Sequence, residues 1–186
     1  QDAITAPIRA RGDRLTPTTK EGQRAELHKT IWRIANDLRG SVDGWDFKTY
    51  VLGMLFYRFI SENLTVYINN GEHAAGIEDF DFETLPDSEA EFGRAVTVAE
   101  KGFYILPSEL FQNVRKAAPQ DENLNETLGR IFKDIEGSAV GTDSEDDLKG
   151  LFDDLDVNST KLGNTVVKRN EKLVKLLDAI GDLPLG

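Results

Sequence analysis

Residues 26–67 (ELHKTIWRIANDLRGSVDGWDFKTYVLGMLFYRFISENLTVY) join two stretches with helical apolar spacing through a turn bounded by glycines. Gly40 suits the left-handed backbone that closes a helix, and Asp46 suits the N-cap of the next one. We therefore predict one helix that ends near residue 39 and a second that begins near residue 46. The first helix carries its apolar residues on one face: Leu27, Ile31, Ile34, Ala35 and Leu38.

The second helix is predicted over about residues 46–69, ending at Asn69-Asn70-Gly71. Its segment 50–60 is apolar on nearly all sides, with interruptions only at Gly53 and Arg58. A helix that is apolar all round is usually enclosed by other helices. Because this run is shorter than the roughly 20 residues that cross a bilayer, we expect the central helix of a globular core.

Helical spacing continues along the rest of the chain, which predicts an all-α fold. We expect a short helix near 88–98, a short extended piece near 101–106 and a helix that opens at Pro107-Ser108. Three later apolar stripes are Leu124, Leu128, Ile131, Phe132 and Ile135; Leu148, Leu151, Phe152 and Leu155 after a cap at Ser144; and Leu162, Val166, Leu173, Leu176, Leu177 and Ile180. The prediction is a single compact bundle of six or seven helices spanning 21–186, preceded by a flexible arm over 1–20.

The sequence contains none of the catalytic or cofactor-binding motifs that we considered. No cysteine is present, which removes thiolate metal sites and suits a reducing cytoplasm, where we expect this protein to act. No two glycines are separated by a single residue, and no Walker-type Gly-Lys-Ser/Thr occurs, so no phosphate loop is predicted. The acidic run 144–147 is typical of a helix N-terminus, not of a calcium loop. We predict no catalytic, cofactor-binding or metal-binding residue.

The net charge of −11 is distributed unevenly. Residues 71–160 carry seven basic against 22 acidic residues, whereas 1–39 and 161–186 both have a basic excess. Basic groups on helix faces make sequence-independent contacts with DNA phosphates, but surface lysines and arginines alone are a weak signal. The candidate DNA contacts are Lys29, Arg33, Arg39, Lys48, Lys168, Arg169, Lys172 and Lys175.

The run AELHKTIWRIANDLRGSVDGWDFKTYVLGMLFYRFISENL (25–64) resembles the opening of the modification, or methyltransferase, subunit of type I restriction-modification systems. Three later segments resemble further parts of the same region: KGFYILPSELFQNV (101–114), LKGLFDDL (148–155) and TKLGNTVVKRNEKL (160–173). The resemblance covers about residues 22–186.

This resemblance implies a subunit that transfers a methyl group from S-adenosylmethionine to N6 of adenine in DNA. It implies a second modification subunit and a specificity subunit as partners, with a restriction motor subunit as a further one. In that family a catalytic domain with an Asn-Pro-Pro-Phe/Tyr motif follows the helical domain and grips a flipped adenine. No proline here follows an asparagine. We therefore expect a helical N-terminal domain, with upstream residues missing because the chain does not begin with Met and the catalytic domain following residue 186.

Two functions of other classes remain as alternatives. An acidic protein that imitates DNA and binds a restriction enzyme would also be negative and helical, although its acids should spread along the whole chain. A small hydrolase with paired carboxylates is the second alternative, but no acid pair is singled out by its sequence surroundings.

Overall fold

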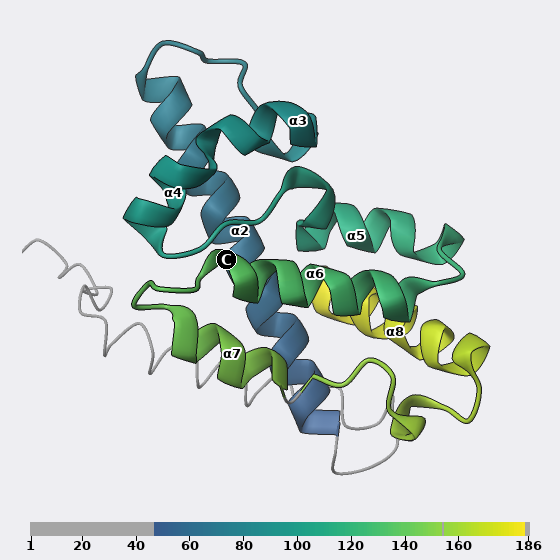
Figure 1. Cartoon of the computed structure of the whole chain (residues 1–186). Helices are drawn as coiled ribbons and strands as arrows, with labels where there is room; N and C mark the ends of the chain where they lie inside the picture. Colours follow the sequence, from purple (N-terminus) through teal and green to yellow (C-terminus); the bar gives the residue numbers. More distant parts are fainter. Residues whose placement is uncertain (1–46, 154, 185–186) are drawn as a thin grey trace, which may run out of the picture. The chain divides into compact units, whose positions relative to one another are not determined.

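A computed structural model describes residues 47–153 and 155–184, all of which are helical or lie in short connections without a β-strand. The central helix α2 (Phe47–Ala74) packs against α5 (Phe111–Ala117) and α8 (Val166–Asp182) (Figure 1). Its buried side chains follow helical spacing at Val51, Met54, Tyr57 and Leu64. The predicted all-α class and the central role of this helix are confirmed. The predicted first helix and the cap at Asp46 lie outside the described residues.

The end of α2 differs from the prediction, because the helix continues past residue 69 to Ala74. Asn69 is not used as a cap: its Oδ1 accepts a hydrogen bond of 2.8 Å from the Phe82 N–H. The helix is closed instead by Gly76, two residues after its last residue, with a φ of 96°. The N–H groups of Gly76 and Ile77 donate to the carbonyls of His73 and Glu72, both at 3.0 Å. This pair of bonds is the Schellman arrangement that glycine favours.

The segment after α2 is built from short helical turns. The helix predicted over 88–98 is in fact three pieces: α3 (Asp87–Ala90), the 3-10 turn η2 (Glu91–Gly93) and α4 (Arg94–Lys101). Gly102, with a φ of 88°, closes α4. The extended piece begins at Phe103 instead of Lys101, and its residues 103–105 are buried. It leads into the 3-10 turn η3 (Pro107–Glu109); a further turn, η1 (Phe82–Thr84), precedes α3.

The remaining helices are α6 (Leu124–Ser138) and α7 (Glu145–Asp153), with the 3-10 turns η4 (Ala118–Gln120) and η5 (Thr160–Leu162) on either side of them. The predicted stripe of α6 is buried throughout. Leu155 lies beyond the end of α7 but is buried against α2: a Cβ atom added to Gly53 would approach the Leu155 methyl carbons to 3.0 Å. The glycine inside α2 thus provides room for this connection.

The last helix begins later than predicted, at Val166 instead of near Leu162. Leu162 is buried in η5, and Gly163 interrupts the helical backbone. Thr165 caps α8, because its hydroxyl accepts a hydrogen bond of 3.2 Å from the Lys168 N–H. Val166 is 46% exposed and does not belong to the apolar stripe.

Aromatic side chains connect four helices in the core. The Tyr57 ring meets Phe111 and Phe132 edge to face, with ring centroids 5.5 and 5.3 Å apart, and Phe132 stacks on Phe152 at 4.6 Å. Such pairs add about 0.5–1.5 kcal/mol each beyond their buried area. Within the described ranges, no helix has the length and apolar character needed to cross a membrane.

Candidate DNA and subunit interface

The predicted basic residues fall on three parts of the chain. Lys29, Arg33 and Arg39 lie outside the described residues, and Lys48 lies in the first turn of α2. The other four all lie within residues 168–175 of α8: Lys168, Arg169, Lys172 and Lys175. The structure therefore groups the C-terminal set on one helix.

Three lysines of α8 form a row on one face. Lys168, Lys172 and Lys175 are separated by four and three residues, which places their side chains next to one another along the helix. Lys168 and Lys175 are exposed, and Lys172 is half-buried. Across the part of the chain that the structure describes, none of the three forms an ion pair. Their ammonium groups can therefore meet a phosphate without first breaking a salt bridge.

Arg169 has a structural partner. Its Nε donates a hydrogen bond of 2.9 Å to the carbonyl of Gly163, and the side chain is half-buried. Gly163 lies so close to α8 that an added Cβ would come within 2.8 Å of the Lys168 Cβ and 3.1 Å of the Arg169 backbone nitrogen. Arg169 thus fixes the turn that leads into the lysine row.

A set of three asparagines, of which Asn125 and Asn170 are buried, anchors α8 to α6 and was missed from the sequence. The side-chain oxygen of Asn170 accepts from the Asn125 N–H at 3.0 Å, and its Nδ2 donates to the Glu122 carbonyl at 2.8 Å. Asn125 in turn donates to the Asn158 side chain at 2.6 Å. Asn170 thereby satisfies the Asn125 N–H, which has no helical partner in the first turn of α6, and the Glu122 carbonyl just before that helix. The only sequence signal was a polar Asn170 within the apolar stripe of α8.

The C-terminal end of α8 is bonded to α2 through Arg58. This side chain is only 8% exposed, and its Nη1 donates to the carbonyls of Ile180 and Leu183, each at 2.6 Å. Its Nε donates to Glu62 at 2.7 Å. A guanidinium group at a helix C-terminus satisfies carbonyls that lack helical partners. Arg58, which the sequence presented as an interruption of an apolar run, therefore positions α8.

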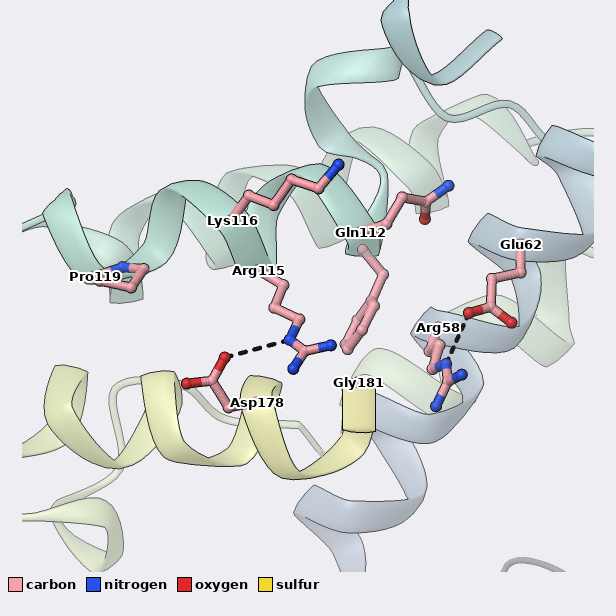
Figure 2. Close-up of a pocket in the computed structure, with 9 residues that line it drawn as sticks. Arg58, Glu62, Gln112, Arg115, Lys116, Pro119, Asp178 and Gly181 are labelled. Carbon is pink, nitrogen blue, oxygen red and sulfur yellow. Dashed lines mark hydrogen bonds and ion pairs between the residues drawn. The ribbon is translucent and has the colours of Figure 1, made fainter. Parts of the chain in front are cut away.

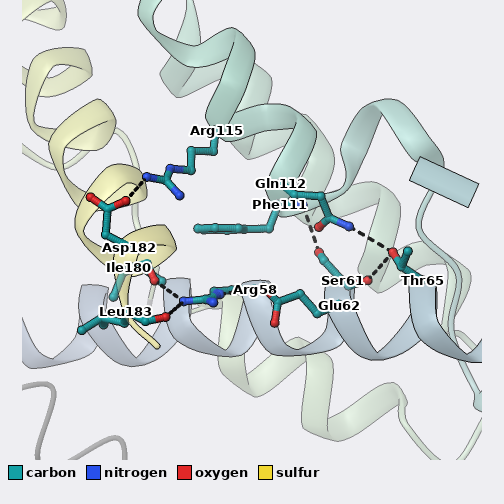
Figure 3. A network of polar contacts seen from close by, with 10 residues as sticks. All are labelled: Arg58, Ser61, Glu62, Thr65, Phe111, Gln112, Arg115, Ile180, Asp182 and Leu183. Atoms are coloured by element: carbon teal, nitrogen blue, oxygen red, sulfur yellow. Dashed lines mark hydrogen bonds and ion pairs between the residues drawn. The ribbon is translucent and has the colours of Figure 1, made fainter. Parts of the chain in front are cut away.

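Figure 3 shows that the polar contacts between α2 and α8 continue into α5. Arg115 pairs with Asp178 at 3.2 Å and also with Asp182, both on α8. On the other side, the Ser61 hydroxyl accepts from the Phe111 N–H at 3.0 Å. Helices α2, α5 and α8 are thus held together by polar bonds as well as by the core.

A pocket of about 360 Å³ lies among these three helices (Figure 2). It is lined by Arg58, Glu62, Arg115, Lys116 and Asp178, among others. Two of its cations are engaged by carboxylates of the lining, and Lys116 pairs with Glu83 at 3.1 Å. The three cations of this pocket are therefore paired with carboxylates, which disfavours the binding of an anion. Among the described residues, no group of three or more histidines and acids could hold a metal ion.

These features define an all-helical domain in which α8 carries a row of lysines and is held to α2, α5 and α6 by polar bonds. The chain belongs to the family described as the HsdM N-terminal domain, whose model matches residues 27–180. It is 47% identical over 170 residues to the type I restriction enzyme MpnII methylase subunit of Mycoplasma pneumoniae, an alignment that covers 88% of this chain and 31% of that protein.

The fold also matches a solved structure. A crystal structure of the type I restriction-modification system methyltransferase subunit from Streptococcus thermophilus aligns with a TM-score of 0.64 and 24% identity. The match covers 87% of this chain and 35% of the other. The chain thus spans about a third of the length of each of these two proteins.

Proposed function

We propose that this chain is a DNA- and subunit-docking domain of a type I restriction-modification methyltransferase. The parent subunit would use S-adenosylmethionine to methylate N6 of adenine, and this domain would help to assemble the modification complex around DNA. Its proposed partners are DNA, the specificity subunit, a second modification subunit and the restriction motor subunit. Family membership favours this role over a DNA mimic.

The observation that carries the DNA-docking proposal is the lysine row of α8. Three lysines without ion pairs in the described residues lie on one helix face, and that helix is bonded to α2 and α6. The number of phosphates that such cations neutralise sets the salt dependence of binding. The acidic middle of the chain repels phosphate, so it restricts the orientation in which DNA can approach.

The test uses the complete methyltransferase with Lys168→Gln and Lys175→Gln combined. A matched control carries Lys133→Gln and Lys149→Gln, two exposed lysines on α6 and α7. DNA affinity is measured across salt concentrations. We expect the slope of log K against log salt to flatten by about 1 for each lost phosphate contact in the α8 variant. An unchanged slope, or the same change in the control, would overturn the DNA-contact proposal.

A second variant tests the N-terminal candidates. Arg33, Arg39 and Lys48 are replaced together by Gln in the same complex, with DNA affinity and assembly measured in parallel. Weaker binding and a flatter salt slope with assembly preserved would support phosphate contacts. Loss of assembly alone would favour a docking surface for another subunit.

A further inference from the structure

A second pocket, of about 630 Å³, lies on another part of the described chain, between α4, α6 and the turn η3. Its wall includes the apolar side chains of Ala95, Val98 and Leu106. Its charged lining consists of Glu91, Arg94, Glu109, Lys133 and Asp134. The pocket therefore combines an apolar wall with carboxyl groups, and it shares no residue with the α8 lysine row.

Glu109 is the unusual member of this lining. The residue is only 6% exposed, and its Oε2 atom is buried without a hydrogen-bond partner among the described residues. Its main chain is fixed, because the Tyr57 hydroxyl donates to the Glu109 carbonyl oxygen. A buried acceptor without a donor is costly, so such a group is rare in a folded protein.

The nearby cations do not supply that donor. Arg94 is engaged by Glu91 through two hydrogen bonds of 2.8 and 2.7 Å, and its guanidinium carbon lies 5.1 Å from the centre of the Tyr104 ring. Lys133, on the exposed side of α6, forms no ion pair within the described ranges. The structure thus contains a carboxyl group with an unfilled acceptor position at the edge of a pocket.

The surroundings of Glu109 also favour its protonated form. The pKa of Glu109 is raised to about 8, first by burial and then by the nearby carboxylate of Asp134. The charge of Asp87 on α3 acts likewise, whereas Arg130 on α6 lowers the pKa. Near neutral pH, Glu109 therefore holds a proton that a bound cation would displace.

We propose that this pocket binds the guanidinium group of an arginine side chain presented by a partner protein, with Glu109 as its receiving carboxylate. A guanidinium offers several N–H donors in a planar fork that matches a carboxylate, and its methylene stem can lie along the apolar wall. A metal ion is a poorer occupant, because the described residues hold no group of acids and histidines in ligand geometry. The proposal rests on the subunit-docking part of the proposed function.

The experiment titrates the 186-residue chain with N-acetyl-arginine amide, followed by the NMR signals of the Glu109 carboxyl carbon and backbone amide. N-acetyl-citrulline amide, which has nearly the same shape and no charge, is the matched probe. We expect saturable shifts with the arginine compound only. Below the pKa of Glu109 the affinity should rise about tenfold per pH unit, because each bound guanidinium releases one proton.

Two variants and a control make the test specific. Glu109→Gln should weaken binding at least tenfold at pH 8, whereas Glu126→Gln, an exposed acid on α6, should leave it unchanged. Asp134→Asn should move the pH at which binding levels off to a lower value, because removing the Asp134 charge lowers the pKa of Glu109. Equal binding of the citrulline compound, or no saturable shift up to pH 8.5, would overturn the proposal. That failure would leave the salt-slope test of the α8 lysines unaffected.

Discussion

Arg58 in α2 donates a hydrogen bond of 2.6 Å to the main-chain oxygen of Leu183, which lies 125 residues later in the sequence at the end of α8. This side chain therefore bonds the end of the last helix directly to the central one. Because α8 also carries the proposed phosphate-binding lysines, the bond connects the apolar core to the candidate interface.

Replacing Arg58 tests this connection. Arg58→Met keeps the apolar stem but leaves the Leu183 carbonyl without its donor, and the Ile180 carbonyl keeps only the Leu183 N–H at 3.4 Å. We expect the free energy of unfolding to fall by about 2–3 kcal/mol, as measured by urea denaturation. Arg130→Met, at an exposed position of α6, should change it by less than about 0.5 kcal/mol. Equal effects of the two substitutions would contradict the role given to Arg58.

Replacing each of two glycines by alanine should change the stability of the domain in opposite directions. At Gly163 an added Cβ would lie 2.8 Å from the Lys168 Cβ, so Gly163→Ala should destabilise the domain by about 1–3 kcal/mol. At Gly150, inside α7, a Cβ would meet nothing within 4 Å. Gly150→Ala should therefore stabilise by about 0.5–1 kcal/mol. Thermal denaturation of both variants checks the prediction, which fails if Gly163→Ala is neutral.

The Tyr57 hydroxyl is buried and donates to the Glu109 carbonyl. Tyr57→Phe keeps the ring contacts with Phe111 and Phe132 but leaves that carbonyl without its donor. We expect a loss of about 1–2 kcal/mol in the free energy of unfolding. The amide of Glu109 should also exchange with solvent faster in this variant, because η3 loses a bond to the core. An unchanged exchange rate would show that the bond does not hold η3 in place.

Glu109 should make the stability depend on pH. Its pKa is raised from an ordinary value of 4.5 to about 8, first by burial and then by the Asp134 carboxylate, so the folded state binds one proton that the unfolded state has released in this window. Stability from this group is therefore fully present below about pH 4.5 and is lost as the pH rises through 8. Relative to Glu109→Gln, the native protein should lose stability between pH 5 and 8. If the difference in the free energy of unfolding between the two proteins is the same at every pH, this assignment is wrong.

Local patterns in the sequence predicted the parts of the fold that depend on helical spacing. The stripe Leu124 to Ile135 gave α6, and the run 50–60 gave the central helix. The end of α2 could not be predicted, because Asn69 is used in a bond to Phe82, and that contact depends on how the chain folds back. The break of the segment 88–98 also coincides with a contact distant in the sequence: the Ala90 carbonyl accepts a hydrogen bond of 2.5 Å from the Tyr104 hydroxyl, 14 residues later.

The candidate sites likewise contain residues that local spacing predicts and residues that it does not. The lysine row of α8 was predictable, since spacing along one helix places Lys168, Lys172 and Lys175 on one face. Glu109 and Arg58 could not be recognised, because each resembles an ordinary surface charge until distant helices bury it. Their roles depend on contacts with α6 and α8 that no local pattern records.

The central claim is that this domain docks the methyltransferase onto DNA and its partner subunits without performing the transfer. The most direct measurement compares the complete methyltransferase with a form that lacks residues 1–186. Subunit assembly, duplex affinity and S-adenosylmethionine binding are determined for both, and cofactor binding is also measured for the isolated 186-residue chain. We predict that the shortened form loses assembly or duplex affinity but keeps cofactor binding, and that the isolated chain does not bind the cofactor. Tight, saturable binding of S-adenosylmethionine by the isolated chain, or a shortened enzyme that assembles and binds DNA normally, would contradict the account.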